Sequence, residues 1–439
     1  MYIEKILMMR KYSFQEDTFL RGALYILLFI GYFQLIPDTP AQENNTQKYH
    51  YFKGVVVDSK TRKPLEFASI SVDGTNISTV TNQDGGFLLK VPDSQMDNDV
   101  TITYLGYYNK VIPLKEFSEK KNVFKLDESI VKLPEVNLLV KDPDDIIKKV
   151  IGNKKKNYLA EPSIMTAFYR ETIKKGKKRY ASLSEAVVEI YKTSYNSTGN
   201  DYVRIYKARK STDYRRLDTL LIKLQGGPYN TLNFDVMKNQ NILFTKDIFN
   251  TYKFTFEKML LVDNRPTYVI GFKQYPSIEE PLYYGKLYID ANTFALSKAV
   301  MSLNLKNKKL AGKYFVKKKP KGAHVEPFQA NYFVDFRRKG NKWFLNYSRI
   351  ELAFKIDYDK KWFNSNYYIT IEMAVTDWKY NTEGLSLKGK ERLRANVILN
   401  DKVSGFRDPK FWGDYNVIEP DKPIENAIKK IKRQLDRKK

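Results

Sequence analysis

The run from Tyr51 to Asp127 constrains the fold of this chain more than any other feature. Apolar and polar residues alternate from Glu66 to Val72, which is the two-residue period of a strand with one buried face. Turn signals interrupt the run at Asp73-Gly74 and Asp84-Gly85-Gly86, where glycine can adopt positive φ and aspartate can hydrogen-bond to its own backbone. Several short strands spaced in this way predict an antiparallel β-sandwich over residues 51–128.

The same run carries a set of short motifs in a fixed order. They are Gly54-x-Val56-x-Asp58, Pro64-Leu65-x-x-Ala68-x-Ile70-x-Val72, Gly74-Thr75, Thr81-Asn82-x-x-Gly85-x-Phe87-x-Leu89 and Tyr104-x-Gly106-Tyr107. Together they resemble the carboxypeptidase regulatory-like domain found at the front of many exported Bacteroidota proteins, which implies a prealbumin-like β-sandwich. Two positions depart from the family pattern: Ser78 stands where glycine is common, and Asn82 where aspartate is common. Asparagine also suits a turn, so the expected fold is unchanged.

The resemblance does not imply an enzyme. In zinc carboxypeptidases the regulatory-like module is an appendage, and histidine and acidic side chains hold the catalytic metal. This chain has only two histidines, His50 and His324, and no cysteine. We expect both histidines in solvated segments, His50 on the approach to the first strand and His324 in a loop. A cysteine nucleophile or a Ser-His-Asp triad also lacks its components, so the sequence predicts a non-enzymatic protein without metal or cofactor.

Residues 1–42 have the order of a secretory signal. An apolar stretch from Ala23 to Pro37 follows basic residues that include Arg21, and it precedes the small-residue segment around Ala41. The alternative is an uncleaved anchor, although the stretch is shorter than the roughly 20 residues that span a bilayer. Lack of cysteine excludes a disulfide framework and a lipid-anchored lipoprotein. We therefore expect an exported protein in the periplasm or associated with the outer membrane.

A linker over residues 129–142 is expected to lead into a larger domain over residues 143–410. Asp142-Pro143 predicts a helix start, since aspartate can cap and proline suits the first helical position. Beyond it, a long series of strands includes expected hairpins at Tyr284–Val300 and Phe333–Ile350. The first hairpin is similar to strand pairs of the lipoprotein-carrier and related half-barrel proteins of the bacterial envelope. That resemblance implies a curved antiparallel sheet around an apolar groove covered by a helix. The predicted fold class is mainly β with a few helices.

The segment 411–439 is predicted to be a tail that ends in a basic amphipathic helix. Ile424, Ile428, Ile431 and Leu435 recur at helical spacing on one face. Basic residues fill the rest of the helix: Lys429, Lys430, Lys432, Arg433 and Arg437. One interpretation is a helix that contacts an anionic membrane through these residues. The other is a terminal helix that packs on its own sheet and leaves its charges in solvent.

A net charge of +26 needs an explanation. In a cytoplasmic protein it would suggest nucleic acid binding, but export argues against that partner. Basic clusters fall in predicted turns at residues 174–179, 317–321 and 337–342. They are either solvated loop tips or a surface attracted to anionic parts of the envelope, such as lipopolysaccharide phosphates, lipid headgroups or acidic glycans.

These observations predict a non-enzymatic cell-envelope binding or docking protein with the sandwich as its interaction module. Its expected partners are another envelope protein or the anionic membrane surface. The alternative is a periplasmic carrier of a lipid or another apolar ligand, which would need an open, apolar groove in the large domain. An enzyme would instead need clustered carboxylates in a cleft, such as a pair about 5 to 9 Å apart.

Overall fold

The computed structural model describes residues 48–118, 121–129, 142–213, 227–315, 321–359, 364–393, 403–406, 408 and 410–436. The predicted signal segment 1–42 and most of the predicted linker lie outside these ranges. By its contacts, Tyr49–Lys439 forms one unit. Within the described ranges, no helix combines the length and hydrophobicity needed to cross a membrane.

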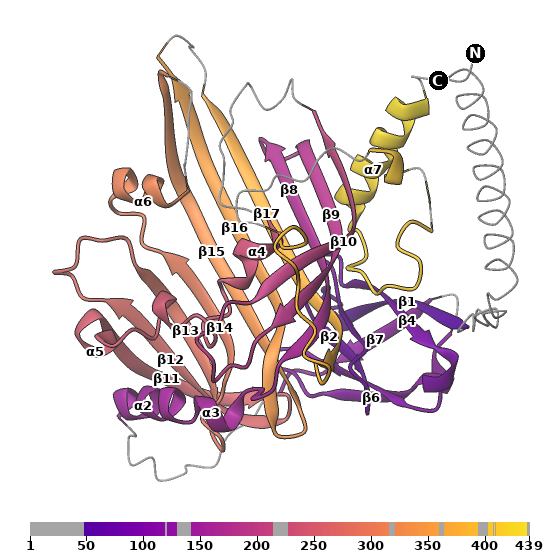
Figure 1. Cartoon of the computed structure of the whole chain (residues 1–439), viewed down its shortest axis with the longest axis horizontal. Coiled ribbons are helices and arrows are strands. Elements are labelled where there is room, and N and C mark those ends of the chain that lie inside the picture. Colours follow the sequence, from indigo (N-terminus) through magenta and orange to yellow (C-terminus); the bar gives the residue numbers. More distant parts are fainter. Residues whose placement is uncertain are drawn as a thin grey trace, which may run out of the picture. The chain divides into compact units, whose positions relative to one another are not determined.

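The first part of this unit is the predicted β-sandwich, built from two small sheets (Figure 1). Phe52, Val56, Ile70, Phe87 and Ile102 are buried between them. Every strand pair in the described part of the sandwich is antiparallel except one: β1 and β7 run parallel, which corrects the prediction of an antiparallel sandwich at that pair. The three-stranded sheet has the order β4 (Gly86–Pro92), β1 (Tyr49–Asp58), β7 (Asn122–Leu126), and the four-stranded sheet has the order β3 (Ser78–Val80), β2 (Ser69–Val72), β5 (Asp99–Thr103), β6 (Lys110–Pro113).

The family motifs lie at positions where the sandwich has specific steric or hydrogen-bonding requirements. A Cβ at Gly54 would lie 2.6 Å from the ring of Phe87 and 2.7 Å from the carbonyl oxygen of Asn122, so no larger side chain fits between the strands. Asp58 accepts hydrogen bonds from the backbone nitrogen of Lys60 at 3.1 Å and from the Tyr107 hydroxyl at 3.0 Å. The first and last motifs therefore meet in the folded domain. Two short 3-10 helices, η1 (Asp93–Gln95) and η2 (Leu114–Glu116), complete it.

The second part is a ten-stranded sheet in which all neighbouring pairs are antiparallel. Both expected hairpins are present, as β13–β14 and β15–β16. The strands in spatial order are β10 (Tyr202–Thr212), β9 (Arg179–Lys192), β8 (Ser163–Lys175), β17 (Ser365–Tyr380), β16 (Lys342–Tyr358), β15 (Ala323–Lys339), β14 (Leu296–Leu303), β13 (Tyr283–Asp290), β12 (Arg265–Gln274) and β11 (Tyr252–Val262). The mainly β class with few helices is confirmed.

Helices are short and lie outside the sheet. As predicted, Asp142 caps the first of them, accepting a hydrogen bond from the backbone nitrogen of Asp144 at 3.0 Å, and its apolar residues Ile146, Ile147 and Val150 are buried. The described helices are α2 (Pro143–Gly152), α3 (Lys154–Asn157), α4 (Pro228–Leu232), η3 (Gln240–Ile242), α5 (Ile248–Thr251), α6 (Lys308–Phe315), η4 (Val403–Phe406) and α7 (Lys422–Asp436).

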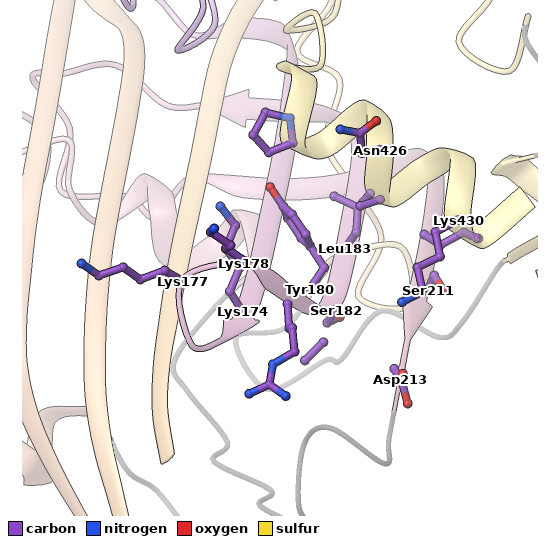
Figure 2. Close-up of a pocket in the computed structure, with 15 residues that line it drawn as sticks. Lys174, Lys177, Lys178, Tyr180, Ser182, Leu183, Ser211, Asp213, Asn426 and Lys430 are labelled. Carbon is purple, nitrogen blue, oxygen red and sulfur yellow. The ribbon is translucent and has the colours of Figure 1, made fainter. Parts of the chain in front are cut away.

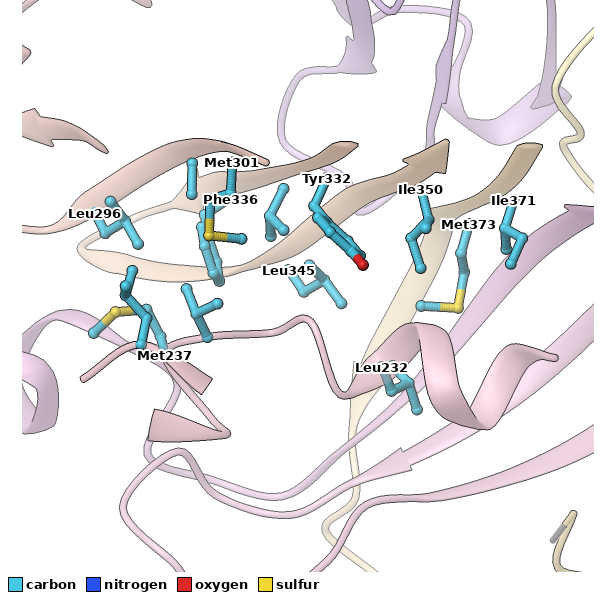
Figure 3. Packing of buried hydrophobic residues seen from close by; sticks show 14 of the residues in the cluster. Leu232, Met237, Leu296, Met301, Tyr332, Phe336, Leu345, Ile350, Ile371 and Met373 are labelled. Atoms are coloured by element: carbon cyan, nitrogen blue, oxygen red, sulfur yellow. The ribbon is translucent and has the colours of Figure 1, made fainter. Parts of the chain in front are cut away.

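The main hydrophobic core covers one face of the ten-stranded sheet, which we call the inner face. Figure 3 shows Leu232 and Met237 opposite strand residues that include Phe336 and Met373. Both belong to the segment 228–251, and this segment buries further apolar side chains in the same core: Val236, Leu243, Phe244 and Ile248. Over the described residues, this part of the inner face is therefore packed by the chain itself.

A buried ion pair fixes that segment to the sheet. Lys192 Nζ lies 2.8 Å from Asp235 and 2.8 Å from Asp201, and all three side chains are nearly inaccessible to solvent. The Tyr195 hydroxyl donates to Asp235 at 2.6 Å and accepts from the backbone nitrogen of Leu345 at 3.1 Å. Since each buried charge has a partner, the desolvation cost is offset and the segment has one defined position.

The sandwich packs on the opposite, outer face of the sheet. Ser78 and Asn82, the two residues that depart from the family pattern, both make hydrogen bonds to residues outside the sandwich. The Ser78 hydroxyl donates to the carbonyl oxygen of Val375 in β17 at 3.1 Å. The Asn82 amide accepts from the backbone nitrogens of its own turn and donates to the carbonyl oxygen of Glu419 at 3.0 Å. Glycine could not make the first bond, and an ionised aspartate could not donate the second.

Residues 410–421, which we call the C-terminal strap, run between the sandwich and the sheet before α7 begins. Asn416 makes two side-chain hydrogen bonds to the backbone of Lys90, on the free edge of β4, at 2.7 and 3.0 Å. Val417 and Ile418 share a small core with Val80 of the sandwich and Phe168 of β8. The predicted tail thus connects the two parts of the fold before it ends in a helix.

Candidate functional site: a basic pocket beside the C-terminal helix

Two clusters of charged side chains lie beside the strap and α7. The first is a buried charged junction of Arg170, Glu185 and Arg209. Glu185 is completely buried and accepts from Arg170 Nε at 2.8 Å and from Arg209 Nε at 2.7 Å. Burial alone would raise the pKa of Glu185, but attraction to Arg209 and Arg170 outweighs it and holds the pKa below its ordinary value.

The strap supplies further contacts to the two arginines of the charged junction. Arg170 Nη2 donates to the carbonyl oxygen of Ile418 at 2.8 Å, and the guanidinium of Arg209 lies 5.0 Å from the ring centroid of Trp412. Polar groups that are buried and fully partnered rigidify a structure. This junction therefore holds the sheet and the strap together.

The second cluster lines a pocket of about 610 Å³ between the β8–β9 hairpin and α7. Figure 2 shows Tyr180 and Leu183 between the two elements, with Lys174 and Lys178 on the hairpin side and Lys430 on the helix side. Its cationic lining residues are Lys174, Lys177, Lys178, Arg179 and Lys430; the others are Tyr180, Ala181, Ser182, Leu183, Ser211, Asp213, Pro423, Asn426, Ala427 and Ile431.

The hairpin brings its basic residues to the pocket through a tight turn. Gly176 has a φ of 63°, which glycine adopts without steric cost. Next to this turn the register between the strands shifts, because Ile173 pairs with Ser182 while Lys174 pairs with Tyr180. Such a bulge re-aims side chains at the end of a strand pair. Lys174 and Tyr180 consequently contact one another, with Lys174 Nζ 4.7 Å from the centroid of the ring.

α7 forms the other wall. Asp421 caps the helix, accepting from the backbone nitrogen of Ile424 at 2.8 Å. Ile424 is buried with Leu183 and Phe406, and Ile428 and Ile431 pack against the same cluster. The described apolar residues of the helix are thus packed on its own sheet, as in the second interpretation above, while Lys429, Lys430 and Arg433 remain exposed.

Burial within the pocket changes the titration of its inner residues. It lowers the pKa of Lys174, with a smaller opposing effect from the carboxylate of Asp421. It raises the pKa of the Tyr180 hydroxyl, so the ring stays neutral at physiological pH. Among the described residues, Lys174 forms no ion pair with a carboxylate; its ammonium lies over the ring of Tyr180.

The predicted site residues do not share one environment in the structure. Lys429, Lys430 and Arg433 are exposed on α7, Lys432 is half-buried, and Arg437 lies outside the described residues. Of these, Lys430 lines the pocket. The other cations of the pocket, Lys174, Lys177, Lys178 and Arg179, come from a basic cluster that was visible in the sequence. Nothing in the sequence related this cluster to the helix.

The other basic clusters lie elsewhere. Arg337 donates to the carbonyl oxygen of Asn76 in the sandwich at 3.1 Å, and Lys342 donates to that of Lys156 at 2.8 Å. The cluster 317–321 falls outside the described residues except for Lys321.

Both histidines are in strands, contrary to expectation. His50 lies in β1 and His324 in β15, where pairing with β16 extends the strand beyond the expected loop. Each lies 2.7 Å from one carboxylate, Asp93 and Asp359 respectively. Among the described residues, no group of three or more histidine or acidic side chains is placed to hold a metal ion.

Several solved structures are distantly similar to this chain. A DUF1329 family protein from Desulfovibrio piger is 12% identical, with 56% of this chain and 96% of that chain covered and a TM-score of 0.25. A LolA superfamily protein from Nitrosomonas europaea is 10% identical, with 58% and 99% covered and a TM-score of 0.23. The MucA/MucB complex of Pseudomonas aeruginosa gives 12% identity, 54% and 99% coverage and a TM-score of 0.15. These TM-scores do not establish a shared fold.

No curated protein matches the sequence. A family model, the CarboxypepD_reg-like domain, matches residues 52–138, which include the sandwich expected at 51–128 from Phe52 onward and most of the linker expected at 129–142. The N-terminal part of this chain is therefore a CarboxypepD_reg-like domain.

Proposed function

We propose that this protein is a non-enzymatic binding or docking protein of the cell envelope, and that it contacts an anionic component of the envelope through the basic pocket. The observation that carries the proposal is the pocket itself. Five cationic side chains line it, four from the β8–β9 hairpin and one from α7, about 250 positions apart in the sequence. One carboxylate, Asp213, also lines it. Convergence of like charges costs energy unless an anion or solvent compensates it, so the arrangement favours an anionic partner.

Export supports the choice of partner. The apparent signal over residues 1–42 favours the periplasm or the outer membrane, where anionic lipids and glycans are abundant and nucleic acid is not. In this proposal the sandwich is an interaction module whose contacts include its own chain. Through Ser78 and Asn82 it anchors the sheet and the strap, and the strap positions α7 beside the hairpin.

The carrier alternative would use the inner face of the sheet. Over the described residues, segment 228–251 already packs there, and the ion pair between Asp235 and Lys192 holds it in place. An apolar ligand at that position would have to displace the segment and separate a buried ion pair, at a cost of several kcal/mol. The packed core therefore supports docking over carriage.

A vesicle flotation assay tests the proposal. The full chain is mixed with vesicles of phosphatidylethanolamine that contain a minor fraction of phosphatidylglycerol. We expect binding that weakens with salt, and a roughly 30-fold loss for the variant K177Q/K178Q at about 1 kcal/mol per lysine near the surface. The matched control K155Q/K156Q removes the same charge from two exposed lysines of α3. Equal loss of binding in both variants would show that only the net charge matters, and it would refute the pocket as the contact.

A further inference from the structure

We propose that the pocket recognises a phosphate monoester carried by an amphipathic molecule, namely a phosphate-bearing lipid headgroup, with Lys174 as its innermost cation. This inference rests on the proposed function and specifies the ligand of the same site. It combines three observations on the described residues: the charge of the rim, the position of Lys174, and the apolar floor.

The exposed cations around the pocket, which we call its rim, favour a compact anion with more than one charge. Lys177, Lys178 and Arg179 are exposed at the hairpin turn, and Lys430 is exposed on α7. Lysine and arginine from two sides can donate to different oxygens of one phosphate, whereas a carboxylate has only two acceptor oxygens. The doubly charged phosphate monoester gains most from such a set of donors.

Lys174 marks where the phosphate would sit. Its ammonium is half-buried and lies over the face of Tyr180, 4.7 Å from the ring centroid. The ring attracts the cation but carries no charge to neutralise it. Among the described residues no carboxylate forms an ion pair with this ammonium, and burial lowers its pKa. A phosphate between Lys174 and the rim would supply the missing counter-charge.

The floor distinguishes a lipid headgroup from free phosphate. Leu183 is buried beneath the pocket, and Tyr180, Ile431 and Ala427 add half-buried apolar surface. A volume of about 610 Å³ falls in the range of drug-sized ligands, far more than one phosphate needs. The remaining space and its apolar lining suit the glycerol and the first methylenes of an acyl chain. A basic rim above an apolar floor is thus complementary to an amphipathic phosphate.

Calorimetric titration of the full chain tests this with a soluble probe, dihexanoyl phosphatidic acid below its micelle concentration. We expect saturable 1:1 binding, and binding that is at least about tenfold weaker for dihexanoyl phosphatidylcholine and for inorganic phosphate. Affinity should rise between about pH 5 and pH 7.5, as the phosphate loses its second proton near pH 6. K174Q should reduce the affinity at least about tenfold, as expected for a lost charge-assisted hydrogen bond.

Controls separate the possible failures. K430Q changes an exposed helix residue, so it should fold normally and still weaken binding about two- to fivefold, while K155Q should have no effect. Inorganic phosphate binding as tightly as the lipid would overturn the lipid assignment. If vesicles bind through the hairpin lysines but the soluble phosphatidic acid does not bind, this inference fails while the proposed function stands. If neither binds, both fail.

Discussion

Replacing Glu185 by glutamine should destabilise the folded chain by about 3–5 kcal/mol, the usual cost of removing one partner from a buried ion pair. Glu185 is completely buried, and the side chains of Arg170 and Arg209 are only 2% and 9% exposed. In E185Q both guanidiniums lose their counter-ion in a place that water does not reach. The oxygen of the new amide could accept one of the two hydrogen bonds, but its nitrogen would face the other arginine with a second donor.

Urea unfolding of the full chain, followed by tryptophan fluorescence, measures this loss. Trp412 is a useful reporter because its ring contacts Arg209. The matched control is E189Q in the same strand. Glu189 pairs with Arg204, but these side chains are 24% and 37% exposed, so the loss there should be about 0.2–1 kcal/mol.

Measuring E185Q in a second variant, R209M, tests whether the unpaired arginines cause the loss of stability. In R209M only one buried cation would be left without a partner, so E185Q should cost less there than in the natural chain. A loss below about 1 kcal/mol for E185Q, similar to that of E189Q, would show that water or a rearranged strap compensates the arginines, contrary to this reasoning. Acid should act in the same direction as E185Q. Because the folded state lowers the pKa of Glu185, its stabilisation is present above the unfolded pKa and disappears as pH falls through the folded value.

Three further predictions concern the sandwich. N82D should keep the turn but lose the donor to the carbonyl of Glu419, so hydrogen exchange should become faster in the C-terminal strap; unchanged exchange there would contradict the assignment. G54A should cost about 1–3 kcal/mol or more in thermal unfolding because its Cβ would overlap an aromatic ring, while G152A, which meets no atom within 4 Å, should not destabilise. Burial lowers the pKa of Lys90 to about 8, so its proton is lost earlier in the folded than in the unfolded state. Stability should therefore rise between about pH 8 and pH 10 relative to K90M, and parallel pH profiles would refute this.

Much of the fold could be predicted because its signals are local. The sandwich follows from motifs that combine alternation with turn residues, and the hairpins β13–β14 and β15–β16 follow from strands that are adjacent in sequence. The start of α2 follows from Asp142 and Pro143. Each of these depends on a few neighbouring residues, whose conformational preferences act before any distant contact forms.

The two errors and the main omission concern contacts over long distances in the sequence. β1 and β7 pair in parallel. Both histidines lie in strands, His50 in β1 and His324 in β15, because pairing with β4 and β16 extends these strands over them. Filling of the inner face by segment 228–251 was also not predictable. Apolar residues in that segment indicate burial, but no local pattern says which face of which strand they will cover.

The sequence by itself determined the elements of the candidate site: an amphipathic basic helix and a basic hairpin turn. Only the tertiary structure decided that they form one pocket. The pairing of β8 with β17 places the hairpin, and the strap, held by Asn82, places α7 beside it. Like charges repel one another wherever they lie in a chain. The sequence therefore does not show which cations the fold will bring together. That depends on strand register and on buried contacts, such as those of Glu185, that outweigh the repulsion.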